Sequence, residues 1–229
     1  MSIITKEQKR SYDTKGYILI SGLIAHEIVM KAAETMRGQL EIESGNIKSW
    51  EGPSSVHQVY EEPSLLACYT PAVCAAAATL AGDDAASFKP PLRAYTINVF
   101  PGKGHWSWQP PHIDHALKEH GYRVFPPPIR IAAMIYLSDV PQHGGGTMVW
   151  PGSHGKLESL AKSDPVRYGM MWMLKLEIEK LDLGSPVELT PRCGDVLFYH
   201  YLLAHSGSTN TSDRPRFALN MKWPAKADK

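Results

Sequence analysis

The sequence predicts a mainly β protein, a sandwich or jelly roll with helices on the outside. Two observations lead to this prediction. Short β-like runs separated by glycine and proline turns fill the chain from about residue 91 onward, and the expected helices precede them without alternating with them. Several short strands separated by turns favour a sandwich or barrel, whereas alternating strands and helices would favour a parallel α/β sheet. A chain of 229 residues is long enough for a single domain of this kind with a substantial core.

The first 90 residues are expected to form a helical support region. Ala25–Leu40 carries apolar residues close to helical spacing. Thr70 and Pro71 suit the N-cap and first turn of a second helix, which runs to Leu80. The other elements expected here are a polar helix over residues 5–15, a short buried strand over 16–20 and an irregular polar stretch over 45–62.

Residues 91–229 are expected to form the jelly-roll core. The predicted strands are Leu92–Phe100, Trp108–His115, Ile129–Leu137, Thr147–Trp150, Val187–Leu189, Asp195–Tyr201 and Phe217–Trp223. An insert at about residues 154–184 separates two of these strands. Unstructured insertions of this length in compact domains are commonly lids or binding elements. The insert is equally compatible with a peripheral helix whose methionines and Trp172 pack against the core.

The composition limits the classes of partner. Hydrophobic residues make up 43% of the chain and charged residues 21%, which is ordinary for a globular protein. The net charge of +1, without any run of lysine and arginine, argues against a nucleic-acid partner. The first ten residues lack a signal-peptide pattern, and no apolar run approaches membrane-spanning length. Three cysteines without metal-type spacing indicate no disulfide framework and a cytoplasmic location.

A histidine and a carboxylate two residues apart, His112 and Asp114, form a candidate metal site. Successive side chains of a strand alternate faces, so these two point the same way. With ten histidines and 23 acidic residues, such a pair is expected about once by chance, so a third ligand is needed. His205, far along the chain, is well placed to supply it. Two histidines and one carboxylate make the facial triad of non-haem Fe(II) oxygenases, which leaves three coordination positions open.

Arg216 lies eleven residues after His205, at the start of a predicted strand. The polar stretch between them is expected to be a turn, and the runs that flank it a hairpin-like pair. A guanidinium in this place could hold one end of a dicarboxylate such as 2-oxoglutarate while the metal holds the other. Arg214 is the competing arginine, but it precedes a proline in the turn and is expected to be solvated.

Several motifs in order resemble those of the phytanoyl-CoA dioxygenase-like family of Fe(II)/2-oxoglutarate-dependent oxygenases, over nearly the whole chain. They include the opening segment from Tyr12, the run from Asn98 to Gly102, the glycine-rich turn with Pro151-Gly-Ser-His154, and Cys193-Gly-Asp195. The resemblance implies a double-stranded β-helix, a cupin-like jelly roll. It also implies Fe(II), 2-oxoglutarate and dioxygen as cofactors, with release of succinate and CO2.

By the same resemblance His112, Asp114 and His205 would bind iron, Arg216 would bind 2-oxoglutarate, and Asn98 and Thr147 would be further co-substrate contacts. Related halogenases lack the carboxylate ligand, so its presence favours hydroxylation or another oxidation such as desaturation. The chain departs from the family pattern at Gly207, where relatives carry serine or threonine. That serine or threonine supports the arginine in relatives, so Ser206 or Ser208 would have to support Arg216 here. His154 is expected to order a turn and to lie outside the metal site.

The substrate is expected to be a small molecule. Trp108, His115 and Trp172 are candidate pocket residues, and Arg123 or Arg130 could bind an anionic group, although core or lid packing explains the tryptophans equally well. Two other functions remain open. One is a cupin-type metal dioxygenase that needs no 2-oxoglutarate, in which Arg216 would have no task. The other is a non-catalytic binding or sensing protein on the same scaffold. The sequence does not indicate an oligomeric state.

Overall fold

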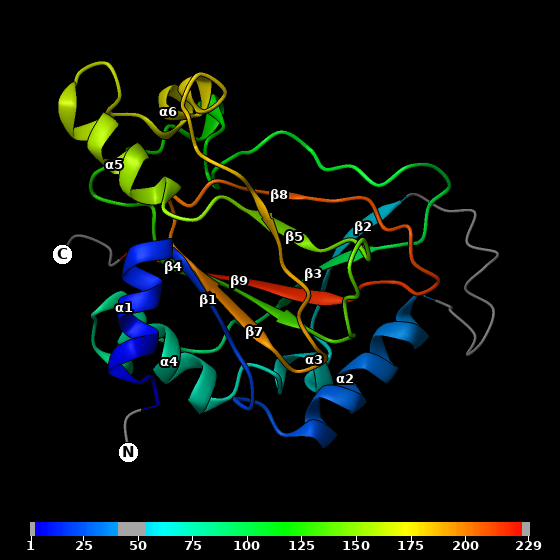
Figure 1. Ribbon diagram of the computed structural model, residues 1–229. Helices are drawn as coiled ribbons and strands as arrows, with labels where there is room; N and C mark the ends of the chain where they lie inside the picture. The colour runs from blue at the N-terminus through cyan, green and yellow to red at the C-terminus, as the bar shows by residue number, and fades with distance from the viewer. Residues whose placement is uncertain (1–2, 41–53, 226–229) are drawn as a thin grey trace.

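A computed structural model of the protein describes residues 3–40 and 54–225. Two antiparallel sheets form its centre (Figure 1). The six-stranded sheet has the order β1 (Tyr17–Ile20), β7 (Val196–Tyr199), β4 (Ile129–Tyr136), β9 (Ala218–Pro224), β3 (Ala94–Val99) and β2 (Ser55–Tyr60). The three-stranded sheet has the order β6 (Val187–Glu188), β5 (Thr147–Val149) and β8 (His205–Gly207). The predicted jelly-roll class is confirmed.

Helices cover the outside of this arrangement. Figure 1 shows the early helices along one side of the large sheet, and the two helices of the insert beyond the small sheet. The α-helices are α1 (Lys6–Lys15), α2 (His26–Gln39), α3 (Pro63–Leu66), α4 (Pro71–Ala81), α5 (Ser153–Ser163) and α6 (Met171–Ile178). The described residues also form the 3-10 turns η2 (Ala85–Ser87) and η3 (Lys118–His120).

Local capping explains where the early helices begin and end. The Thr5 hydroxyl accepts from the Gln8 amide and the Gln8 side chain accepts from the Thr5 amide, which forms a capping box for α1. That helix ends at Gly16, where φ is +80° and a Cβ would clash with the imidazole of His154. Thr70 caps α4 in the predicted way, with Pro71 at its first position.

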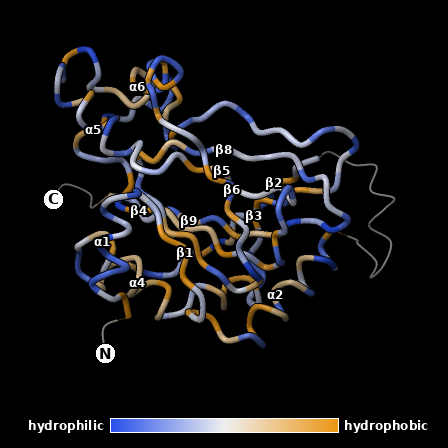
Figure 2. The backbone as a smooth tube through the Cα atoms, in the orientation of Figure 1, coloured by the Kyte–Doolittle hydropathy of each residue, from blue (hydrophilic) through white to orange (hydrophobic). Residues whose placement is uncertain are grey.

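The large sheet buries a different set of residues on each face. Alternate residues of β4, β7 and β9 pack with α1 to α4 in one apolar cluster, and the residues between them pack with the small sheet, α5 and α6 in a second. Figure 2 shows hydrophobic stretches along the central strands. The site described below lies on the second face.

Most predicted elements are confirmed, with three corrections. Residues 55–60, expected to be irregular, form strand β2; the part of that stretch before residue 54 lies outside the described residues. The predicted strand Trp108–His115 is not a continuous strand: isolated bridges join it to β8 and to Ser208, and the chain turns at Asp114 and His115. The runs around Arg216 are not a hairpin-like pair, because β8 pairs with β5 in the small sheet whereas β9 pairs with β3 and β4 in the large one. The chain crosses between sheets at this turn.

The insert packs against the core. Met171, Leu174 and Ile178 of α6 are buried in the second apolar cluster, together with Leu157 and Ala161 of α5. Side chains at helical spacing therefore fill space beside the small sheet. Among the described residues, no helix combines the length and the hydropathy that crossing a membrane requires.

Candidate metal centre and its cavity

The two histidines of the predicted triad lie opposite each other across two extended segments. The backbone amide of His112 donates to the carbonyl of His205 at 2.9 Å, and the amide of His205 donates to the carbonyl of His112 at 3.0 Å. This reciprocal pair is the hydrogen-bonded arrangement of an antiparallel bridge, which places both side chains on the same face. The imidazole centroids are 4.5 Å apart.

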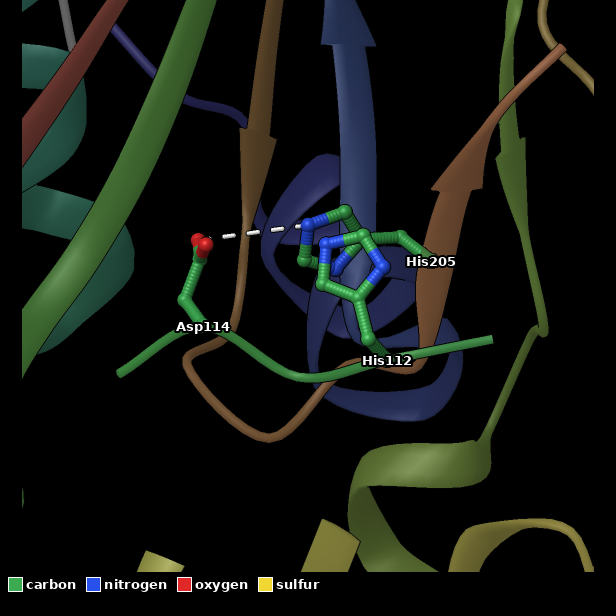
Figure 3. Close-up of side chains that lie close together, drawn as sticks. All are labelled: His112, Asp114 and His205. Carbon is green, nitrogen blue, oxygen red and sulfur yellow. Dashed lines mark ion pairs between the residues drawn. The ribbon is translucent and has the colours of Figure 1, made fainter. Parts of the chain in front are cut away.

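Asp114 completes the group from the segment of His112. Its Oδ2 lies 3.9 Å from His205 Nε2. One ligand atom from each of the three residues lies within 4.8 Å of the others, and Figure 3 shows the three side chains converging on a common space. Two imidazole nitrogens and one carboxylate oxygen at this spacing fit a divalent transition metal of the facial-triad kind.

The protonation states also suit a metal. Burial, together with the neighbouring His205, lowers the pKa of His112 to about 4, so its imidazole is neutral at pH 7. Burial alone would raise the pKa of Asp114, but His205 and Lys222 outweigh it and lower that pKa to about 2. The Leu203 carbonyl lies 2.9 Å from His205 Nδ1 and can only accept, so the proton sits on Nδ1 and Nε2 is free for a metal.

A cavity of about 840 Å³ extends from these ligands to Arg216. Arg216 is buried in its wall, and its Nε has no hydrogen-bond partner among the described residues. Its other nitrogens make only long contacts, 3.8 Å to the sulfur of Met134 and 3.4 Å to the carbonyl of Ile97. Burial lowers the pKa of Arg216 from its ordinary value. A buried guanidinium with no anion among the described residues is costly, so this end of the cavity is suited to an anionic group.

Thr147 and Asn98 were both predicted to contact the co-substrate, and the structure separates them. Thr147 lines the cavity, where its hydroxyl lies 2.9 Å from the hydroxyl of Tyr136. Asn98 lies on the opposite face of β3, where its amide contacts Met36 of α2 and Thr96. The prediction for Asn98 is therefore wrong, because strand alternation turns its neighbours on β3 toward the cavity instead.

Ser206 and Ser208 were the candidates for the supporting role that relatives give to the residue at position 207. Neither supports Arg216. The Ser208 hydroxyl donates to the Gly146 carbonyl at 2.8 Å. The Ser206 hydroxyl is buried and has no partner in the described part of the chain. Neither hydroxyl hydrogen-bonds Arg216. His154, expected to lie outside the site, contacts the Asp13 carbonyl near α1.

Of the three substrate candidates, only Trp108 lines the cavity, at its exposed mouth. The chain turns at His115, with φ of +58°, and its ring packs against Tyr122. Trp172 lies on α6 beneath the ammonium of Lys118. Neither His115 nor Trp172 belongs to the cavity wall, so both predictions are corrected. The insert contributes no residue to this wall either.

The arginines suggested for an anionic substrate also lie elsewhere. Arg130 is bound to Asp83 at 2.9 Å and to Ser87, beside the early helices. Arg123 is exposed and does not line the cavity.

Three residues beside Asp114 escaped the sequence-based prediction. Lys222 Nζ donates to Asp114 Oδ1 at 2.7 Å, and the Tyr199 hydroxyl donates to Oδ2 at 3.1 Å. The Asn220 amide donates in turn to the Tyr199 hydroxyl at 3.2 Å. The signal was available, because Asn220 and Lys222 follow Arg216 by four and six residues. Period two places all three on one face of a strand.

A match to a known family model assigns the chain to a protein family. The family model of phytanoyl-CoA dioxygenase matches residues 12–218. The chain belongs to this family. None of the curated proteins matches it.

Solved structures of the same fold cover almost all of the chain. The non-haem α-ketoglutarate-dependent carbocyclase SnoK from nogalamycin biosynthesis has 21% identity and a TM-score of 0.64, over 97% of this chain and 85% of its own. The epimerase SnoN, solved with Fe3+, α-ketoglutarate and nogalamycin RO, has 20% identity and a TM-score of 0.61, over 94% and 82%. EctD from S. alaskensis, solved with 2-oxoglutarate and 5-hydroxyectoine, has 20% identity and a TM-score of 0.59, over 97% and 77%. These similarities establish the jelly-roll fold.

Proposed function

We propose that this protein is an Fe(II)- and 2-oxoglutarate-dependent oxygenase. In this proposal it hydroxylates, or otherwise oxidises, a small organic substrate and releases succinate and CO2. Family membership supports the class of enzyme. The reactions of its structural neighbours differ, since they include a carbocyclase and an epimerase, so the family leaves the outcome of the oxidation open.

One observation carries the proposal: a buried arginine that has no anion among the described residues shares a cavity with a His/Asp/His group. The metal group alone would fit many metalloproteins. The arginine alone would fit many anion sites. Together they fit a small dicarboxylate that binds a metal at one end and a guanidinium at the other.

Each residue group of the cavity has a specific role in this proposal. His112, Asp114 and His205 would hold iron through one face and leave three positions open. Arg216 would bind the distal carboxylate of 2-oxoglutarate, beside the hydroxyl of Thr147. Bound Fe(II), with dioxygen and 2-oxoglutarate, supplies the oxidising power that a C–H bond requires.

A cupin-type dioxygenase that needs no 2-oxoglutarate is the alternative. It explains the metal ligands, but it gives no reason to bury Arg216 with no counter-charge over residues 3–40 and 54–225. A non-catalytic sensor likewise has no need for a metal site whose ligands are already in their metal-binding protonation states.

An anaerobic titration tests the proposal directly. Fe(II) and 2-oxoglutarate should together produce a weak metal-to-ligand charge-transfer band in the wild-type protein. Asp114→Ala and His205→Ala should each weaken iron binding by more than about 100-fold, since even groups that only support metal ligands contribute about 10- to 100-fold.

His26→Ala is the matched control for this titration, because His26 is exposed at the start of α2 and lies away from the cavity. It should bind iron like the wild type. Unchanged iron binding in the two ligand variants would remove the metal assignment. Iron binding without any response to 2-oxoglutarate would favour the cupin-type alternative.

A further inference from the structure

Lys222 occupies the metal end of the cavity. It lies on β9 on the same face as Arg216, and its ammonium donates to Oδ1 of the ligand Asp114 at 2.7 Å. Its side chain is 29% exposed and lines the cavity, so a bound molecule can reach it.

The two oxygens of Asp114 have separate partners. Oδ2 accepts from Tyr199 and lies 3.9 Å from His205 Nε2, so it is the oxygen that faces the second metal ligand. Oδ1 is held by Lys222. A metal bound through Oδ2 would leave the contact between Oδ1 and Lys222 in place.

The charges of the cavity do not balance with the co-substrate alone. Among the described residues that line it, Asp114 is the one carboxylate, whereas Arg216, Lys222 and Lys103 are cationic. If the proposed function holds, the distal carboxylate of 2-oxoglutarate neutralises Arg216, and its other carboxylate together with Asp114 neutralises the two charges of Fe(II). Lys222, which contacts Asp114, then has no counter-charge of its own among the described residues.

One positive charge therefore remains beside the metal, and Lys103 adds another at the mouth. Uncompensated charge in a partly buried site is unfavourable, and a cleft lined by one sign of charge attracts the opposite sign. A single extra charge at the inner end matches a monoanion such as a carboxylate better than a phosphate dianion.

We propose that Lys222 binds a carboxylate of the primary substrate, and that the substrate is therefore a small organic acid. This inference rests on the proposed function, and it names the substrate class of that site. Trp108 and Tyr95, which line the cavity and are 44% and 38% exposed, offer aromatic surface to the rest of the molecule. The carboxylate would approach the Asp114–Lys222 pair from the open side of the cavity.

The test uses protein loaded with Zn(II) and N-oxalylglycine, which mimics 2-oxoglutarate and does not turn over. Binding of these two is measured first by calorimetry, so that failure at this step counts against the proposed function alone. The probes are then two matched pairs: phenylacetate with phenylacetamide, and indole-3-acetate with indole-3-acetamide. Each acid should bind about tenfold or more tightly than its amide, as expected for a charge-assisted hydrogen bond.

Three variants locate the effect. Lys222→Met should bring the acid and amide affinities together, and Lys222→Arg should retain the preference for the acid. Lys103→Met is the matched control: it removes an equal charge from the exposed mouth of the same cavity and should change the preference less than twofold in 0.15 M salt. Metal affinity and melting temperature are measured for every variant. If Lys222→Met does not fold, Lys222→Gln takes its place.

Equal binding of acids and amides by the wild type, or no binding of either at millimolar concentration, would overturn the inference. So would a preference for acids that survives in Lys222→Met. If metal affinity alone falls in that variant, and the wild type shows no preference, Lys222 only positions Asp114. If Lys103→Met loses the preference for acids to the same extent, the preference comes from the overall positive potential of the cavity. That result would also overturn the role of Lys222.

Discussion

The two faces of β9 show how one strand serves two purposes. Phe217, just before the strand, and Leu219 and Trp223 within it are buried in the apolar cluster beneath the early helices. Arg216, just before the strand, and Lys222 within it lie on the other face and line the cavity. The first face removes apolar surface from water and stabilises the fold. The second holds charged groups whose partners are incomplete, which costs stability and prepares the site for ligands.

Arg216→Met is expected to have the largest effect, and it acts on the cavity face. Loss of a buried charge pair with the co-substrate should weaken 2-oxoglutarate binding by at least about 30-fold, since such pairs contribute about 2–5 kcal/mol. Iron affinity should stay unchanged. Because the guanidinium has no anion in the part of the chain that the structure describes, the melting temperature without 2-oxoglutarate should not fall.

Arg214→Met is the matched control for that titration, because Arg214 is exposed in the neighbouring turn and its guanidinium pairs with Asp213. It should change 2-oxoglutarate affinity less than twofold. If Arg216→Met binds 2-oxoglutarate as tightly as the wild type, the cavity face of β9 has no ligand-binding role at Arg216. The cupin-type alternative would then be favoured.

Leu219→Ala tests the helix-covered face of the same strand. Its side chain is fully buried, so truncation should lower the free energy of unfolding by about 2–5 kcal/mol, measured by chemical denaturation. The folded variant should keep its affinities for iron and 2-oxoglutarate. Leu92→Ala is the control, because Leu92 is 90% exposed and its loss should cost no more than about 0.5 kcal/mol. Loss of ligand affinity comparable to Arg216→Met would show that the two faces are not separable.

The smallest effect is expected at His200, a largely buried titratable group outside the cavity. Burial, with help from His154, lowers the pKa of His200 to about 4. The unfolded chain takes up a proton near pH 6.5, whereas the folded protein takes it up only near pH 4. Stability is therefore lost as pH falls through this window.

His200→Gln should lose less stability than the wild type between pH 7.5 and pH 5, by on the order of 1 kcal/mol because His200 is partly exposed. Melting curves at the two pH values measure the difference. Identical pH dependence in the two proteins would show that buried polar groups outside the cavity carry no such cost.

The metal ligands illustrate what local pattern can predict. The spacing of His112 and Asp114 predicted that both point the same way, and the structure has both beside His205. The same period-two rule would also have found Lys222 from Arg216. For Asn98 the rule was not enough, because alternation says which residues share a face and not which face meets the cavity. That choice depends on the packing of α2 against β3.

The sequence by itself determined the local elements: the capped helices, most of the strands, and the residue types and spacings of the candidate site. These follow from backbone sterics, capping and periodicity, which act over a few residues. Tertiary structure decided which face of β3 meets the cavity, the crossing of the chain from β8 to β9, the packed position of the insert, and the contact of Lys222 with Asp114. Each of these depends on pairing between segments far apart in the chain, and no local rule specifies such pairing.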